Sequence, residues 1–355
     1  MLLYVCVAIW PLIVQYIYTN KPLGIRKKRI KNDKYLIFAL IPIFLILAFR
    51  NETMGADTGT YVRHFLNTIN TPLDSIFANS RMEVGYLIFV KLITCITHNQ
   101  LIYQIICVLF MIYGLYSFLK ELKINDALVF IYFYCTLGVF FFMFTGTRQC
   151  LAMGICLFSY KFLKQKQYFK FLLCVLLAYY FHKSAVLFII VLFIYNRKVS
   201  SINIIVYSIA ALVIGGNLSS IQQWFNDTLD YTYSIEYTGN GMIFLTVLLA
   251  LTVFSMIMIY NREGGFNINK DTRIFININF ITLMFWIMRL QTRVAERPSY
   301  YFIFFSCAFY ANALNSIKNS NERRIYKIII YSLAMLLYIY RLKTNFAGLV
   351  PFEFY

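Results

Sequence analysis

The chain alternates between long apolar runs and short polar segments along its whole length. The apolar runs extend for about 14–20 residues, close to the length that an α-helix needs to cross the hydrocarbon core of a bilayer. Strands of a membrane barrel would be about ten residues long, with strict alternation of apolar and polar positions. The pattern therefore predicts an all-α, polytopic integral membrane protein with about 12 transmembrane helices. The predicted spans cover residues 2–19, 35–49, 101–119, 127–144, 148–163, 168–181, 183–195, 201–215, 242–260, 273–290, 298–315 and 325–341.

One further apolar stretch, 84–97, is predicted not to cross the membrane. If both it and 101–119 crossed, every later basic loop would move to the outer side. We therefore expect a re-entrant or interfacial segment, which is tolerated where protein covers its backbone. The whole chain, 1–355, is predicted to form a single transmembrane domain, with outer loops at about 50–83 and 216–241.

Composition and charge support this class. The chain is 60% hydrophobic and 14% charged, with a formal net charge of +18. Such a charge also occurs in nucleic-acid-binding proteins, but most of the basic residues cluster in loops between apolar runs, beginning with 21–34 after the first run. Because basic loops stay cytoplasmic, the charge indicates topology, with the N-terminus outside, and no nucleic-acid partner is expected. The eight cysteines lie in or beside apolar runs without ligand spacing, so neither disulfides nor a metal site is expected.

With this topology, ionisable residues gather at the outer ends of apolar helices, where charge is costly and usually functional. Arg148 follows a glycine turn in an aromatic run, and His182 lies between two apolar runs. The ordinary explanations are a snorkelling arginine and a structural histidine. Arg81 and Glu83 precede the segment 84–97 and could reach the same site.

Two further groups of residues are candidates. Arg289, Arg293 and Arg297 recur every four residues, which predicts one helix face, and an internal ion pair accounts for at most one of them. A bound polyanion such as pyrophosphate accounts for all three, because the planar guanidinium suits phosphate oxygens. In the segment after Arg50, positions 57, 61 and 65 share a predicted helix face, and Asp57 lies near the helix start. A solvated loop with a capping aspartate is the alternative for this segment.

Several of these segments also occur together in a known family. They are Arg50…Gly55-Ala56-Asp57-Thr58…Tyr61, Glu83-Val84-Gly85-Tyr86, Thr145-Gly146-Thr147-Arg148-Gln149, Phe181-His182-Lys183-Ser184-Ala185 and, more loosely, Arg293…Arg297…Tyr300. Their order and spacing over about 35–315 resemble the EpsG-like family of Wzy-type polymerases of bacterial exopolysaccharide, capsule and O-antigen. The sequence departs from the family at Thr145 and Thr147, and the loop after 216 has no feature that matches.

The resemblance implies glycosyl transfer between two lipid-linked saccharides on the outer face of the bacterial inner (cytoplasmic) membrane. The implied partners are an undecaprenyl-diphosphate-linked oligosaccharide, membrane lipid and a chain-length regulator. A lipid-diphosphate leaving group needs fixed cations, and the acceptor hydroxyl needs a positioned base. The expected diphosphate- and sugar-binding residues are Arg50, Tyr61, Arg81, Arg148, Arg289, Arg293 and Arg297, and the expected catalytic residues are Arg148, His182, Asp57 and Glu83.

Within that scheme His182 is favoured as the base or as the group that orients the acceptor, because histidine titrates near neutral pH. Asp57 and Glu83 would bind sugar hydroxyls or orient arginines, although either becomes a base if burial raises its pKa. No Asp-x-Asp pair lies on the outer side, so we expect a metal-independent enzyme without a cofactor.

Three other classes fit parts of the pattern. A lipid-linked oligosaccharide flippase or another transporter also carries intramembrane charge, but the two halves show no inverted repeat and the charges lie at one face. A membrane O-acyltransferase would want its histidine on the cytoplasmic route of the acyl donor. A purely structural membrane partner leaves the row of arginines unexplained.

Overall fold

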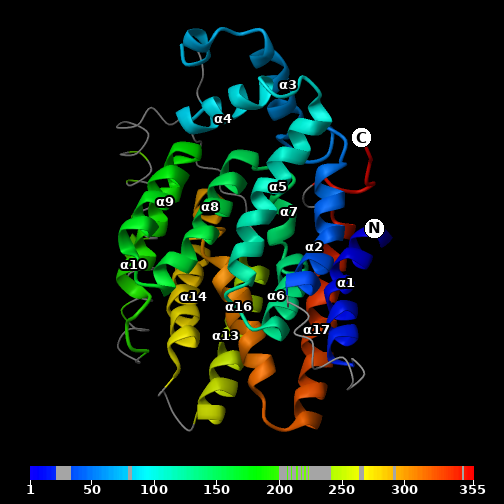
Figure 1. Cartoon of the computed structure of the whole chain (residues 1–355). Helices are drawn as coiled ribbons and strands as arrows, with labels where there is room; N and C mark the ends of the chain where they lie inside the picture. The colour runs from blue at the N-terminus through cyan, green and yellow to red at the C-terminus, as the bar shows by residue number, and fades with distance from the viewer. Residues whose placement is uncertain are drawn as a thin grey trace. The chain divides into compact units, whose positions relative to one another are not determined.

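The structure is a computed structural model that describes residues 1–20, 33–78, 82–199, 241–263, 268–290, 293–345 and 348–355, with isolated positions between 199 and 241. Its regular elements are helices, which confirms the predicted class (Figure 1). The chain divides into two compact units, one formed by Met1–Val186 with Ile328–Tyr355 and the other by Leu187–Lys327. The single transmembrane domain stays a prediction.

The elements follow the apolar runs of the sequence. The first unit contains α1 (Leu2–Thr19), α2 (Asp33–Ala48), α3 (Thr58–Ile69), η2 (Leu73–Ile76), α4 (Val84–Thr94), α5 (Gln100–Leu119), α6 (Ile124–Thr136), α7 (Val139–Phe142), α8 (Thr147–Lys164) and α9 (Tyr168–Phe181). The second contains α10 (Ile190–Ile194), α13 (Gly241–Glu263), α14 (Lys270–Arg289), η4 (Arg293–Ala295), α15 (Glu296–Ser299) and α16 (Ile303–Ser316). Two elements, η3 (Lys183–Ile189) and α17 (Ser320–Lys343), run from one unit into the other.

Four helices in the described ranges are both long and apolar enough to cross a bilayer: α1, α5, α17 and, over Gly241–Arg262, α13. Shorter apolar helices include α4, α6 and α9. The membrane class is therefore supported, whereas the predicted count of twelve spans is not confirmed. The predicted span 201–215 falls largely outside the described residues.

The predicted span 127–144 is broken in the structure. Helix α6 ends at Thr136, and Gly138 adopts the left-handed backbone conformation, with a φ of +80°. This conformation strains residues that carry a Cβ, so glycine is suited to the break. Arg341 Nη1 donates to the carbonyl of Leu137 at 3.1 Å, which satisfies an acceptor that the break releases. The apolar pattern alone did not reveal this interruption.

Helices α3 and α4 lie at one end of the first unit, where α4 runs crosswise over the ends of α8 and α9 (Figure 1). Helix α4 has 11 residues, which at 1.5 Å per residue span roughly 16 Å, about half of the hydrocarbon core. Lys91 of α4 donates to the carbonyls of Thr68, Ile69 and Thr71, at 3.2, 3.4 and 2.7 Å. These carbonyls lie at or just beyond the end of α3, where acceptors are not fully used by the helix, so Lys91 joins the two helices. A segment that does not cross agrees with this geometry.

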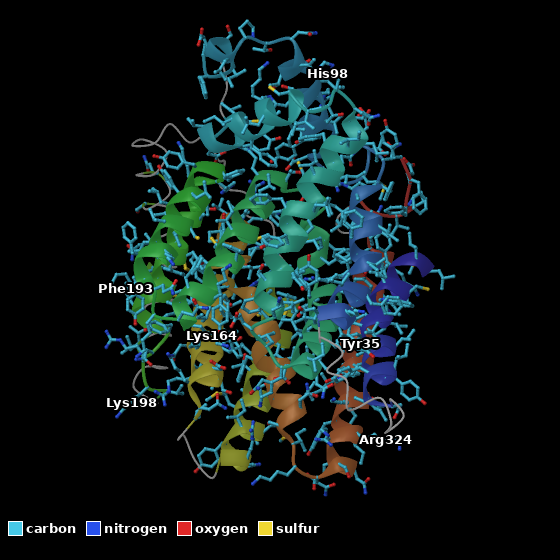
Figure 2. All side chains as sticks on the ribbon, in the orientation of Figure 1. Tyr35, His98, Lys164, Phe193, Lys198 and Arg324 are labelled. Carbon is cyan, nitrogen blue, oxygen red and sulfur yellow. The ribbon has the colours of Figure 1, made fainter. Side chains whose placement is uncertain are left out.

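The two ends of the first unit differ in chemistry. Figure 2 shows His98 near the end that carries α3 and α4, and Tyr35 and Lys164 farther from it. Lys164 pairs with Glu121 at 3.2 Å, and Lys120 pairs with Asp33 at 3.3 Å, in the loops where the sequence predicts the cytoplasmic side.

Residues 348–355 pair with the segment that follows α2. Asn51 N donates to the carbonyl of Glu353 at 2.9 Å, and Tyr355 N donates to the carbonyl of Phe49 at 2.9 Å. The hydroxyl of Thr53 donates to the Glu353 carboxylate at 2.7 Å. The chain around Arg50 is therefore held in place by a segment distant in sequence.

The second unit has a buried polar core. Asn279 of α14 donates to the hydroxyl of Thr252 in α13 at 3.0 Å, and Tyr310 of α16 donates to the Asn279 side-chain carbonyl at 3.1 Å. Polar side chains that pair with one another hold apolar helices together where lipid offers no partner. This network fixes how α13, α14 and α16 pack.

Candidate functional site

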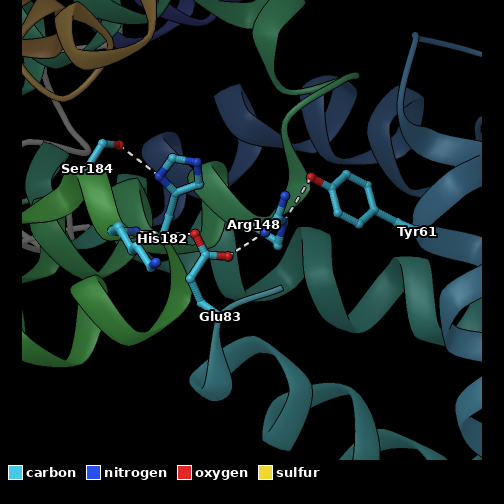
Figure 3. A network of polar contacts seen from close by, with 6 residues as sticks. Tyr61, Glu83, Arg148, His182 and Ser184 are labelled. Atoms are coloured by element: carbon cyan, nitrogen blue, oxygen red, sulfur yellow. Dashed lines mark hydrogen bonds and ion pairs between the residues drawn. The ribbon is translucent and has the colours of Figure 1, made fainter. Parts of the chain in front are cut away.

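An ion pair between Arg148 and Glu83 lies at the centre of the candidate site (Figure 3). Arg148 is in the first turn of α8, and Glu83 immediately precedes α4. The side chain of Glu83 is 6% exposed, whereas that of Arg148 is 23% exposed. The Glu83 carboxylate therefore contacts mainly other protein groups, whereas the Arg148 guanidinium is partly accessible to solvent or a ligand.

Glu83 also holds the segment that carries His182. The backbone N–H of Lys183 donates to Glu83 Oε1 at 3.3 Å, while Oε2 pairs with Arg148. His182 ends α9 in an extended conformation, and its Nδ1 lies 2.7 Å from the hydroxyl oxygen of Ser184. One carboxylate therefore brings together the start of α8 and the residues after α9 (Figure 3).

Gly85 explains how α4 reaches this position. A Cβ added at Gly85 would lie 2.7 Å from the carbonyl oxygen of Tyr180 and 2.8 Å from its Cβ. These separations are too short for any side chain, so the first turn of α4 can approach the end of α9 because residue 85 is glycine. Glu83 is placed beside Lys183 as a result.

Helix α3 supplies a third side of the site. Its residue Tyr61 is 7% exposed and accepts a hydrogen bond from Arg148 Nε at 3.3 Å. Burial raises the pKa of Tyr61, so the phenol stays protonated at neutral pH. Among the described residues, Arg148 forms hydrogen bonds through Nε and Nη1, which leaves the Nη2 amino group for a ligand.

The other residues predicted in this region have different surroundings. Arg50 is 3% exposed, donates to the carbonyl of Leu47 and donates from Nε to the hydroxyl of Thr58 at 3.4 Å. Asp57 precedes α3, as predicted, but its carboxylate makes no capping hydrogen bond.

Arg81 lies outside the described residues, as do most positions of the predicted outer loop 216–241. The loop predicted at 50–83 contains α3 and η2.

The late arginines do not share one helix face, so that prediction was wrong. Helix α14 ends at Arg289, and Arg293 and Arg297 belong to the separate short elements η4 and α15. Arg289 is 6% exposed and donates from Nε to Glu296 at 2.9 Å, and the hydroxyl of Tyr300 donates to the other carboxylate oxygen at 2.8 Å. Arg289 is therefore paired internally. Arg293 and Arg297 are exposed. The pattern failed because helix α14 ends at Arg289, and repeat spacing does not reveal where a helix ends.

Sequence reasoning missed two residues near Arg148. His64 follows Tyr61 by three positions on α3 and stacks on Tyr86, with ring centroids 5.8 Å apart. The helical spacing that selected Tyr61 would also have selected His64. Ser184 belongs to the segment noted around His182, but nothing in its residue type indicates a contact with the imidazole.

The arrangement can bind an anion and move a proton. Arg148 offers donors at the N-terminus of α8, where the helix dipole adds positive potential. His182 has one ring nitrogen beside Ser184, which fixes the orientation of its other nitrogen. No group of three or more His, Cys, Asp or Glu side chains within the described ranges is placed to hold a metal ion. The metal-independent chemistry stays a prediction.

Comparison with known proteins adds a family. The model of the EpsG family matches residues 33–354, which is most of the chain. No curated protein and no solved structure matches the chain.

Proposed function

The chain belongs to the EpsG family of membrane proteins of polysaccharide biosynthesis, and on that basis we propose that it is a repeat-unit polymerase. In this proposal a growing glycan on undecaprenyl diphosphate is transferred to a sugar hydroxyl of a lipid-linked repeat unit. The reaction takes place on the outer face of the bacterial inner membrane. The observation that carries the proposal is the convergence of Arg148, Glu83, Tyr61 and His182 at the end of the unit opposite its basic loops.

Arg148 is assigned to the leaving group. When the anomeric carbon–oxygen bond breaks, the lipid diphosphate leaves with the electron pair, and negative charge develops on its oxygens. A fixed guanidinium stabilises that charge most strongly where water is largely excluded. Glu83 and Tyr61 orient the guanidinium through Nη1 and Nε, so Nη2 can point at the diphosphate.

His182 is assigned to the acceptor. The acceptor hydroxyl oxygen forms the new bond to the anomeric carbon, and its proton passes to the imidazole. Nδ1 of His182 and the hydroxyl of Ser184 are hydrogen-bonded. We assign the tautomer in which Nδ1 carries the proton and donates a hydrogen bond to Ser184, so that Nε2 is the nitrogen that receives the acceptor proton. Asp57 precedes α3 and is proposed to bind sugar hydroxyls.

The exposed arginines of the second unit are proposed to bind further anionic parts of the substrates. Arg293 and Arg297 are the candidates, and Arg289 is proposed to position them through its pair with Glu296. A chain-length regulator is a further proposed partner.

The experiment is complementation of a deletion strain, with surface glycan analysed on a gel and membrane levels of each variant measured. Arg148→Lys retains the charge but loses the planar fork, and His182→Ala loses the base. Arg63→Ala is the matched control, because Arg63 is an exposed arginine of α3 whose described hydrogen bond goes to Thr60 in its own helix.

A polymerase predicts that the deletion strain carries single repeat units on its surface. We expect Arg148→Lys and His182→Ala to give the same result at normal membrane levels, and Arg63→Ala to restore polymer. Lipid-linked units that accumulate on the cytoplasmic side would indicate a flippase. Normal polymer from both site variants would remove these residues from the mechanism.

A further inference from the structure

A small cavity with both apolar and polar walls lies among α3, α5 and the start of α8, all within the first unit. Its volume is about 10 Å³, which leaves room for one small particle such as a water molecule or a monatomic ion. The polar side chains that line it are Arg50, Thr58, Tyr61, Tyr103, Gln104 and Thr147. A cavity of this size cannot hold a phosphate group or a sugar, so it is not a subsite for the proposed substrates.

Arg50 gives the cavity a positive charge. The side chain is buried, and the hydrogen bonds of its guanidinium go to two neutral oxygens, the Leu47 carbonyl and the Thr58 hydroxyl. Burial lowers the pKa of Arg50 to about 10, which still leaves it charged at neutral pH. No carboxylate lines the cavity, and no ion pair of Arg50 occurs among the described residues. A buried cation without a counter-charge is strongly unfavourable.

Gln104 independently indicates a missing ligand. Gln104 is 3% exposed. Neither the nitrogen nor the oxygen of its side-chain amide has a hydrogen-bond partner among the described residues. Unpartnered polar atoms at such depth are rare and costly, and they commonly mark the place of a bound ion or water. The unpartnered amide belongs to the same cavity as the uncompensated guanidinium.

Two of the other residues that line the cavity offer hydrogen-bond donors. Tyr61 accepts from Arg148, so its own hydroxyl proton can be donated into the cavity. Thr147 begins α8, where backbone N–H groups lack helical acceptors and the helix dipole is positive. A neutral water would satisfy one or two of these donors but would leave the charge of Arg50 uncompensated.

We propose that this cavity binds one monatomic anion of chloride's size as the buried counterion of Arg50. The anion accepts hydrogen bonds from the Arg50 guanidinium and from the side-chain amide of Gln104. In this arrangement the NH₂ group of Gln104 faces the anion. By joining the segment after α2 to α5 and α8, the bound anion stabilises the part of the fold that carries Tyr61. This site shares Tyr61 with the proposed reaction site but takes no part in the reaction, and its test requires no polymerase activity.

The experiment is thermal unfolding of the purified full-length protein in detergent, with chloride replaced by gluconate at constant ionic strength. Gluconate is too large for the cavity. At a chloride concentration about ten times its Kd, we expect the wild-type melting temperature to rise by about 3 °C. Gln104→Glu places a carboxylate beside Arg50, so this variant should melt in gluconate near the wild-type temperature in chloride and lose its chloride dependence.

The control variant is Arg63→Met, which removes an exposed arginine of α3 and should retain the full chloride dependence. Bromide should replace chloride, and anomalous scattering from crystals grown in bromide should place an ion beside Arg50. A wild-type melting temperature that does not change with chloride would mean that the cavity holds water, and the proposal would be wrong. Chloride dependence that persists unchanged in Gln104→Glu would place the anion elsewhere and would equally overturn it.

Discussion

The guanidinium of Arg148 and the carboxylate of Glu83 pair across 65 positions of the sequence and join the start of α8 to the start of α4. The same carboxylate accepts the N–H of Lys183, so it is shared between two segments. Because Glu83 is the more buried partner, it is better placed to position neighbours than to contact a substrate. The ion pair therefore holds the site together, and Arg148 is the partner that can contact a substrate.

The first prediction concerns the stability that this pair contributes. Arg148→Met leaves the Glu83 carboxylate buried and unpaired, and Glu83→Gln leaves the guanidinium without its counter-charge. Each change should lower the free energy of unfolding by about 2–3 kcal/mol. The double variant should lose clearly less than the sum of the two, and denaturation in detergent measures the difference.

Lys120 and Asp33 provide the matched control for that cycle. They form an ion pair of 3.3 Å whose side chains are 44% and 34% exposed. Solvent screens such a pair, so its coupling energy should be about 0.5 kcal/mol or less. Equal coupling energies in the two cycles would contradict the central role given to Arg148 and Glu83.

The second prediction concerns Ser184, which touches the imidazole of His182 and is proposed as a positioning residue. Ser184→Ala should lower the rate of polymer formation about tenfold, since the imidazole loses the partner that fixes its orientation. Ser184→Thr retains the hydroxyl and should restore most of the rate. In vitro, the acidic limb of the pH–rate profile should shift in Ser184→Ala and not in Ser184→Thr. An unchanged profile in both would reduce Ser184 to a packing residue.

Much of the fold and part of the site follow from the sequence. The apolar runs predicted the helical membrane class, and charge at helix ends selected Arg148, His182 and Glu83, which the fold brings together. The break at Gly138 was missed because apolar side chains continue through it on both sides. Contacts between distant segments carry no signal in one sequence, and nothing in the residue pattern distinguishes Gln104 from other positions of an apolar helix.

The third prediction tests the close approach of α4 to α9. Gly85→Ala would place a methyl group within 3 Å of Tyr180 backbone and Cβ atoms, so α4 must move and Glu83 with it. We expect a loss of stability of about 2 kcal/mol and strongly reduced polymer formation. Gly59→Ala is the control, since its new Cβ meets the Glu52 carbonyl at an ordinary 3.4 Å. Because Gly59 lies in α3, its replacement should be neutral or slightly stabilising. Equal behaviour of the two variants would show that α4 is not packed this closely.

The last prediction concerns His64 and acid. Its ring stacks on Tyr86 at an interplanar angle of 25°, and its Nε2 is buried without a hydrogen-bond partner among the described residues. Burial, and secondly the charge of Arg148, lowers the pKa of His64. Protonation is therefore less favourable in the folded protein than in the unfolded chain, where the pKa is about 6.5. The neutral form contributes stability above about pH 6.5, and this contribution is lost as the pH falls through the lower folded pKa.

Melting temperatures measured from neutral to acidic pH test this directly. His64→Phe keeps a ring on Tyr86 and removes the titrating group, so its melting temperature should fall less on acidification than that of the wild type. His98→Gln replaces an exposed histidine and should follow the wild-type curve. Arg148→Met removes a charge that opposes protonation of His64. Between neutral and acidic pH, this variant should therefore lose less stability than the wild type. If His64→Phe and the wild type lose the same stability between neutral and acidic pH, the neutral imidazole beside Arg148 is not what limits acid stability.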